Sequence, residues 1–315
     1  MLFGEHSVVH KYPCLVTAVD LRFQVSLEKI DAPSIIIETP LLSELGEPFS
    51  LPINEVFNDK FLNQHTKFIV ASIRKVFSRF NIQQSMRIKS SGPVNSFGLG
   101  SSSAVTVATV LALLKLFDIP SDNQLIFDLA YAAVLEVQTL GSGFDVASAI
   151  YGGTLLYQMT LKPEVLPVDH LPLVIGYSGS KVNTTNLVKK VEHLRLEFPE
   201  IVELIFKAIG EITNAARIAI LQSNWQTAGN LANINQGLLD GLGISTPSLN
   251  APILVSRQNG AFGAKLSGAG GGDCMFAIID EKIRSQVEQA MEASGVQVLH
   301  LGTNVEGVRL ESDVA

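Results

Sequence analysis

A glycine- and serine-rich segment between a predicted strand and an apolar helix is the strongest chemical signal in the sequence. It consists of Gly98, Leu99, Gly100, Ser101, Ser102 and Ser103. Glycines let a ligand approach the backbone closely, and the first turn of a helix offers free N–H groups, so such a segment can bind phosphate. Its hydroxyls can add hydrogen bonds and one Mg²⁺ ligand. The alternative is a turn that only caps the helix, and the lysine of a GxxxxGK[ST] loop is absent from the sequence.

A second cluster places one carboxylate, Asp145, in a Gly/Ser turn at the predicted start of a helix. Backbone N–H groups and the helix dipole stabilise an anion there, which suits it to orient or deprotonate a hydroxyl, or to hold a cation. The alternative role is helix capping. Upstream, Glu136 either faces the same cleft or is a solvated charge on the preceding helix.

A third cluster holds five glycines within residues 263–272, between two predicted strands. Because glycine is costly in chain entropy, such a loop indicates a sharp bend or a close backbone approach, and a plain hairpin needs only one or two glycines. Lys265 in this segment is expected to be a solvated strand residue, with a phosphate contact as the alternative.

The elements that position these clusters follow from hydrophobic periodicity and from Gly, Pro and cap signals. Strands are predicted at residues 19–28, 34–38, 84–90, 153–159 and 171–177. Helices are predicted at residues 103–117, at 122–138 with Asp122 as N-cap, from 145 to 152, and at 185–197, 199–223 and 225–242. A strand, a glycine loop, a strand, a helix and a strand then follow between residues 262 and 301. We place a domain boundary between residues 162 and 172.

Composition and charge limit the function classes. The 315 residues carry a net charge of −7, which gives the whole surface no electrostatic reason to bind nucleic acid or anionic lipid. No apolar run is long enough to span a bilayer. The two cysteines, Cys14 and Cys274, form no metal-ligand pattern, so we expect a protein of the reducing cytoplasm.

The three clusters, together with the opening residues, resemble the three signature motifs of the GHMP kinases. Residues 2–13, which include Gly4, Glu5 and His6, match the first motif, residues 98–104 the second and residues 267–272 the third. The resemblance spans nearly the whole chain. It implies an α+β fold with an N-terminal domain of the ribosomal-protein-S5 type (residues 1–167), a C-terminal ferredoxin-like domain (residues 168–315) and an active site between them. It also implies a homodimer.

Within this superfamily the likeness is greatest to the mevalonate kinase family, on residues 3–13, 176–181 and 233–239. It implies ATP-dependent phosphorylation of the mevalonate hydroxyl to 5-phosphomevalonate, with ATP and Mg²⁺ as cofactors. Residues 141–146 and 268–274 look more like the phosphomevalonate kinases, so that activity, or that of another GHMP small-molecule kinase, is the alternative. A non-catalytic ligand-binding protein on the same fold is an alternative of another class.

The resemblance also assigns roles to single residues. Gly98, Leu99, Gly100, Ser101, Ser102 and Ser103 would cradle the ATP phosphates. Ser102 would ligate Mg²⁺, with Glu136 as a second metal ligand. Glu5 and His6 would contact the substrate, and Asp145 would lie beside its reacting hydroxyl, as a base or as an orienting group. Gly268, Ala269, Gly270 and Gly271 form the third glycine-rich motif.

One position departs from the family pattern. The resemblance implies a lysine a few residues before Gly4, at a position that would precede Met1. We expect either a coding region that begins further upstream or a catalytically weakened member of the family.

Overall fold

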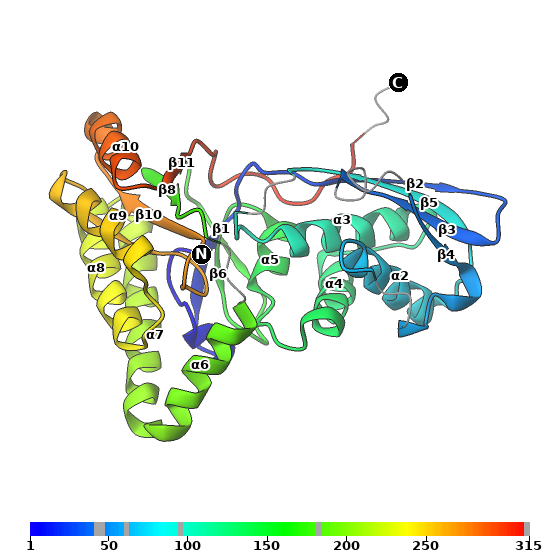
Figure 1. The fold of residues 1–315 in the computed structure, drawn as a ribbon, viewed down its shortest axis with the longest axis horizontal. Coiled ribbons are helices and arrows are strands. Elements are labelled where there is room, and N and C mark those ends of the chain that lie inside the picture. The colour runs from blue at the N-terminus through cyan, green and yellow to red at the C-terminus, as the bar shows by residue number, and fades with distance from the viewer. Residues whose placement is uncertain (41–47, 60–62, 94–96, 181–183, 312–315) are drawn as a thin grey trace. The chain divides into compact units, whose positions relative to one another are not determined.

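The structure is a computed structural model that describes residues 1–40, 48–59, 63–93, 97–180 and 184–311 (Figure 1). By their mutual contacts the residues form two compact units, and each unit draws on three stretches of the chain. Unit 1 comprises residues 1–20, 97–99 and 152–306, and unit 2 comprises residues 21–96, 100–151 and 307–315. The expected division at residue 167 stays a prediction.

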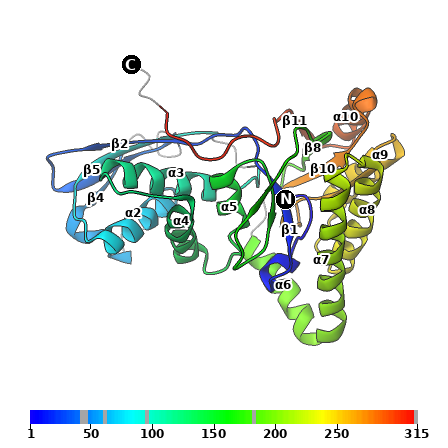
Figure 2. The same ribbon diagram turned by 180° about the vertical axis from the view of Figure 1, so that it is seen from behind.

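Unit 2 is a four-stranded sheet with helices packed on one face (Figures 1 and 2). The strand order is β2-β5-β3-β4, in which β3 and β5 are parallel and the other neighbours are antiparallel. The strands are β2 (Gln24–Lys29), β3 (Ser34–Glu38), β4 (Phe49–Pro52) and β5 (Met86–Ser91). The helices are α2 (Lys67–Phe80), α3 (Ser101–Leu116), α4 (Asn123–Gln138), α5 (Phe144–Tyr151) and the 3-10 turn η2 (Ile53–Glu55).

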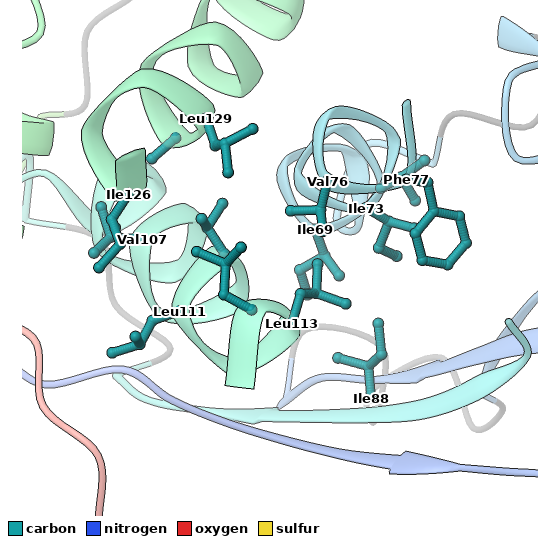
Figure 3. Packing of buried hydrophobic residues seen from close by; sticks show 14 of the residues in the cluster. Ile69, Ile73, Val76, Phe77, Ile88, Val107, Leu111, Leu113, Ile126 and Leu129 are labelled. Atoms are coloured by element: carbon teal, nitrogen blue, oxygen red, sulfur yellow. The ribbon is translucent and has the colours of Figure 1, made fainter. Parts of the chain in front are cut away.

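The core of unit 2 lies where α2, α3 and α4 meet the sheet (Figure 3). Ile73 of α2, Leu113 of α3 and Ile88 of β5 are each fully buried in it. The predicted burial of the apolar helix after the glycine- and serine-rich segment is confirmed, because α3 supplies many residues of this cluster.

Local signals explain where two of these helices begin. Asp122 Oδ1 accepts a hydrogen bond of 2.8 Å from Leu125 N, which confirms the predicted N-cap of α4. Helix α3 begins at Ser101, two residues earlier than predicted, directly after Gly100 with its left-handed φ of 81°. The expected strand at residues 19–28 is too long, since β2 begins only at Gln24. Its first part belongs to unit 1, where Val19 forms a bridge with Thr303.

Unit 1 contains two antiparallel sheets and five of the described α-helices. One sheet has the order β1-β6-β7, with β1 (Cys14–Thr17), β6 (Thr154–Tyr157) and β7 (Glu164–Leu166). The other has the order β11-β8-β10-β9, with β8 (Leu173–Tyr177), β9 (Gly263–Leu266), β10 (Cys274–Ile278) and β11 (Gln297–Leu299). The helices are α6 (Thr184–Glu197), α7 (Pro199–Leu221), α8 (Trp225–Gly241), α9 (Pro247–Gln258) and α10 (Arg284–Ala293), with the 3-10 turns η1 (Ser7–His10) and η4 (Glu281–Ile283).

The β9 strand lies at an edge of its sheet, and α8 covers that edge. Asn233 Oδ1 accepts from Ala264 N at 3.1 Å, and Gln236 Oε1 accepts from Leu266 N at 2.9 Å. The two amides therefore satisfy backbone donors that an edge strand leaves unpaired. A Cβ on Gly263 would lie 1.9 Å from Gly229 O, so this close approach of helix and strand requires glycine.

The predicted order of strand, glycine loop, strand, helix and strand near the C-terminus is confirmed by β9, β10, α10 and β11. The antiparallel sheets of unit 1 and the mixed sheet of unit 2, each packed with helices, confirm the α+β class. Among the described residues, no helix has the length and apolarity needed to cross a membrane.

Candidate active site

In unit 1, a sharp reversal places Glu5 and His6 in the interior. Phe3 forms an antiparallel bridge with Leu15, and Gly4 follows with a φ of 99°. A Cβ on Gly4 would lie 2.4 Å from Cys14 Cβ, so only glycine fits between the two passes of the chain. Glu5 is 1% and His6 is 6% exposed.

Three contacts join this opening segment to the strand and loop of the third glycine-rich cluster. Lys265 Nζ forms an ion pair with Glu5 Oε1. His6 Nε2 lies 2.9 Å from Ala269 O, and Ser267 Oγ donates to the backbone carbonyl of Met1 at 2.8 Å. The structure thus brings the predicted substrate residues and the glycine loop together within unit 1.

The His6 ring has a defined hydrogen-bonding state. A carbonyl oxygen only accepts, so Nε2 must carry the hydrogen that Ala269 O receives, and Nδ1 is left as an acceptor. Burial lowers the pKa of His6 below its ordinary value, which favours the neutral ring near neutral pH.

Lys265 was expected to be solvated, and that expectation is wrong. Its side chain is fully buried, as is the side chain of Glu5 with which it pairs. Burial lowers the pKa of Lys265, and the neighbouring carboxylate of Glu5 opposes that shift. The sequence signal that could have revealed this environment is the apolar strand around the lysine, residues 261–266, in which it is the one charged residue.

The glycines of the third cluster are required by close packing and by backbone conformation. Gly271 N donates to Ile244 O at 2.6 Å, and a Cβ on Gly270 would lie 2.5 Å from the same oxygen. Gly268 has a φ of 84° and no neighbour within 4 Å of an added Cβ. The loop is therefore closely packed against Ile244 at Gly270, whereas no neighbouring atom crowds it at Gly268.

The first part of the predicted phosphate-binding segment is anchored in unit 1. The Phe97 ring packs edge-on against Tyr177, with ring centroids 5.2 Å apart, and Cys274 Sγ donates to Phe97 O. Gly98 has a φ of 73°, and a Cβ there would lie 2.5 Å from Asp273 Cγ. Leu99 packs against a buried hydrophobic cluster of unit 1 that includes Phe3, Leu15 and Phe276.

The second part of the segment forms the start of α3 in unit 2. Ser101, Ser102 and Ser103 are the first three residues of the helix, and no side chain caps it. The N–H groups of a first turn have no partner within the helix, and they combine with the positive end of the helix dipole. This geometry supports the prediction that the segment binds an anion.

Asp145 lies against the start of α3, in the same unit. It occupies the first turn of α5, which begins after Gly143 with a φ of 85°. A Cβ on Gly100 would lie 3.4 Å from Asp145 Oδ1, an ordinary van der Waals distance, so the carboxylate lies directly beside Gly100 at the start of α3. Tyr131 Oη donates to Gly141 O at 2.7 Å and ties the preceding turn to α4.

Burial raises the pKa of Asp145 to about 6, well above the ordinary value for an aspartate. A carboxylate with a pKa near the working pH is a competent proton acceptor, since it is ionised at neutral pH and still basic. The arrangement in unit 2 therefore combines a helix N-terminus without a side-chain cap and a neighbouring carboxylate suited to accept a proton.

Glu136 lies in a different environment from the one expected of a metal ligand. Its Oε1 is 2.9 Å from Arg74 Nη1, and its Oε2 is 2.5 Å from Lys75 Nζ. Both carboxylate oxygens are thus engaged by cations of α2. The metal role assigned to Glu136 stays a prediction, and in the described part of the chain no three His, Cys, Asp or Glu side chains form a metal-binding group.

Comparisons with known proteins agree with this geometry. The family model of the GHMP kinases N-terminal domain matches residues 67–153, and that of the GHMP kinases C-terminal domain matches residues 216–297. The mevalonate kinase of Thermococcus sibiricus is 37% identical over 324 aligned positions, which cover 100% of this chain and 96% of that protein.

Solved structures show the same fold. The mevalonate kinase of Methanococcus jannaschii superposes with a TM-score of 0.78 at 27% identity, over 95% of this chain and 93% of that one. The phosphomevalonate kinase of Streptococcus pneumoniae gives a TM-score of 0.79 at 19% identity, over 96% of each chain, which supports the fold alone. The predicted two-domain fold is confirmed, and the chain belongs to the GHMP kinase family, alongside these archaeal mevalonate kinases.

Proposed function

We propose that this protein transfers the γ-phosphoryl group of ATP to the hydroxyl of mevalonate and forms 5-phosphomevalonate. The observation that carries the proposal is the Asp145 carboxylate beside Gly100, at the free N-terminus of α3. Likeness to mevalonate kinases along the whole chain supports mevalonate as the acceptor.

In this reaction a bond forms between the hydroxyl oxygen and the γ-phosphorus, and the bond from the γ-phosphorus to the β–γ bridging oxygen breaks. Asp145 orients the hydroxyl and accepts its proton as the phosphoryl group is transferred. Backbone N–H groups of residues 98–103 hold the phosphates, because they provide partial positive charge without needing to reorganise.

Mg²⁺ would supply charge neutralisation on the transferred phosphoryl group. The half-buried hydroxyl of Ser102, in the first turn of α3, fits an oxygen ligand for this ion. Glu136 fits less well, since both of its oxygens already face cations. We therefore assign the metal to Ser102 and the Glu136 carboxylate to the ion pairs with α2.

On the substrate side we assign His6, whose Nδ1 is an acceptor for a substrate hydroxyl. Glu5 is fully buried in its pair with Lys265, and we treat it as part of the support of His6. A homodimer, which the family likeness implies, stays a prediction.

An assay of ADP release with mevalonate, phosphomevalonate, homoserine and galactose tests the proposal. We expect mevalonate to give the highest kcat/KM, with 5-phosphomevalonate as the product. Turnover of phosphomevalonate without turnover of mevalonate would assign the alternative kinase activity. Tight mevalonate binding with no ADP release from any acceptor would assign a ligand-binding protein.

The pKa of Asp145 predicts the pH dependence of activity. Because the carboxylate must be ionised to accept a proton, kcat/KM for mevalonate should be constant above about pH 7 and fall about tenfold per pH unit below about pH 6. A pH profile with saturating ATP measures this. The inflection should persist in His6→Asn, which removes the histidine assigned to the substrate, and the melting temperature should be followed over the same pH values. A profile without an inflection between about pH 5 and pH 7 would exclude Asp145 as the base.

The assignment of the metal predicts opposite effects for two substitutions. Ser102→Ala should raise the Mg²⁺ concentration for half-maximal activity by roughly 3- to 10-fold and leave the stability unchanged. Glu136→Gln should leave the Mg²⁺ requirement unchanged and lower the free energy of unfolding by about 1–2 kcal/mol, since Lys75 loses its carboxylate partner and Arg74 keeps only Asp59.

Mg²⁺ titrations and denaturant unfolding of both variants measure these effects. Ser101→Ala is the matched control for Ser102→Ala, because it removes the neighbouring hydroxyl in the same helical turn. A raised Mg²⁺ requirement in Glu136→Gln would return the metal to that carboxylate, and the same result in Ser101→Ala alone would move it to Ser101.

A further inference from the structure

The ion pair between Glu5 and Lys265 is the most deeply buried pair of opposite charges that the structure describes. Both side chains are 0% exposed. Lys265 Nζ also donates to Leu266 O at 2.7 Å, and it lies 5.3 Å from the ring centroid of Phe276 and 5.8 Å from that of Phe3. The ammonium group is therefore held by one carboxylate, one carbonyl and two aromatic faces.

Stability alone does not explain such a pair. Desolvation of two charges offsets most of their attraction, and apolar residues of similar size often replace a buried pair without loss. In addition, Glu5 Oε2 is buried and has no hydrogen-bond partner among the described residues, which adds a cost. The pair points to a specific arrangement that it maintains.

That arrangement is the backbone at His6. His6 directly follows Glu5 and has a φ of 59°, a left-handed conformation that a residue other than glycine adopts only when its surroundings impose it. Its ring is held at Ala269, four residues after Lys265 on the same strand and loop. The ion pair of Glu5 and the hydrogen bond of His6 thus hold two neighbouring residues of the opening segment against β9 and the loop that follows it.

The β9 strand is itself held in place by hydrogen bonds to α8. Lys265 lies between Ala264 and Leu266, whose N–H groups donate to Asn233 and Gln236 of α8. The lysine therefore has little freedom to follow a moving carboxylate.

We propose that Lys265 and Glu5 are positioning residues: their buried pair holds His6 in its left-handed conformation, so that the ring presents Nδ1 to the substrate. Neither residue of the pair touches the substrate. The identity of the substrate as a small hydroxy acid rests on the proposed function. The link from Lys265 through Glu5 to His6 rests on the structure alone.

The test compares the wild type with Lys265→Met, Glu5→Gln and the double variant that carries both. Each single variant leaves an unpaired group in the core, so we expect the KM for mevalonate to rise about 10- to 100-fold and the KM for ATP to stay within about twofold. The melting temperature should fall by roughly 5–20 °C. The double variant removes both charges, so it should recover most of the melting temperature. It still lacks the pair that holds His6, so its KM for mevalonate should stay raised to about the level of the single variants.

Lys282→Met is the matched control, because Lys282 is an exposed lysine of the same unit, away from the site. It should change neither constant. If the single variants melt at lower temperature but keep the wild-type KM for mevalonate, the pair is merely structural and the proposal is wrong. If Glu5→Gln raises the KM for mevalonate and Lys265→Met does not, Glu5 touches the substrate itself and the proposal is again wrong. Should the single variants not fold, the double variant decides alone: a wild-type KM for mevalonate in it would overturn the proposal.

A measurement without turnover separates this inference from the proposed function. The ¹⁵N shifts of the His6 ring report which nitrogen carries the hydrogen, and we expect the Nε2–H form in the wild type and its loss in both single variants and in the double variant. Wild-type protein that phosphorylates no mevalonate would overturn the proposed function. An unchanged ring in both single variants would overturn the role of the pair, whatever the activity.

Discussion

Replacing Asp145 with asparagine is expected to lower kcat by about 10²–10⁴-fold and to leave the fold intact. The amide is nearly isosteric with the carboxylate, so it can keep its place beside Gly100 at the start of α3. It cannot accept the proton of the acceptor hydroxyl, and it removes the negative charge that orients this hydroxyl. Because these effects develop in the transition state, the loss should appear in kcat much more than in the KM for ATP. Steady-state kinetics with mevalonate measure both constants.

Asp122→Asn is the matched control for this experiment. Asp122 is also an aspartate at a helix start in unit 2, where it accepts from Leu125 N as the N-cap of α4. Asparagine caps a helix about as well as aspartate, so this variant should keep both activity and stability. Wild-type turnover in Asp145→Asn would remove this carboxylate from the chemistry.

The elements with strong local signals were predictable from the sequence. Helix α4 follows an aspartate N-cap, and α3 is a long apolar run that the sheet and helices of unit 2 bury. By contrast, α2 and α9 lie outside the predicted helices. The N-terminus of α2 has no side-chain cap, and α9 carries Pro252 in its interior, a residue that usually ends a helix.

Contacts between distant segments were the part of the site that the sequence could not provide. The spacing of motifs predicts that Glu5, Asp145 and the glycine loops matter, but it does not pair a lysine at position 265 with a glutamate 260 residues earlier. The resemblance likewise implies a metal role for Glu136 without indicating which side chains surround its carboxylate. The structure surrounds it with two cations of α2, a helix that was not predicted.

Residue conformation is a further limit of sequence reasoning, and Gly98 illustrates it. The sequence indicates that a glycine lets a phosphate approach, whereas the structure adds a reason within the protein. At Gly98 the backbone is left-handed, and the carboxylate of Asp273 occupies the space where a side chain would be. A substitution there is opposed both by strain and by collision.

Gly98→Ala is therefore expected to lower kcat/KM for ATP by about 100-fold, since strain of a few kcal/mol at this turn displaces the backbone N–H groups proposed to hold the phosphates. Kinetics with varied ATP at saturating mevalonate measure the effect. Gly237→Ala is the matched control, because an added Cβ there meets nothing within 4 Å, and it should keep the activity while raising stability by about 0.5–1 kcal/mol. Asp273→Gly in the Gly98→Ala background removes the carboxylate that the new methyl group meets. It should restore the part of kcat/KM for ATP that is lost through collision. The part that is lost through the left-handed backbone should remain lost. Full activity of Gly98→Ala with ATP would show that the phosphates are held by the first turn of α3 alone, without the turn at Gly98.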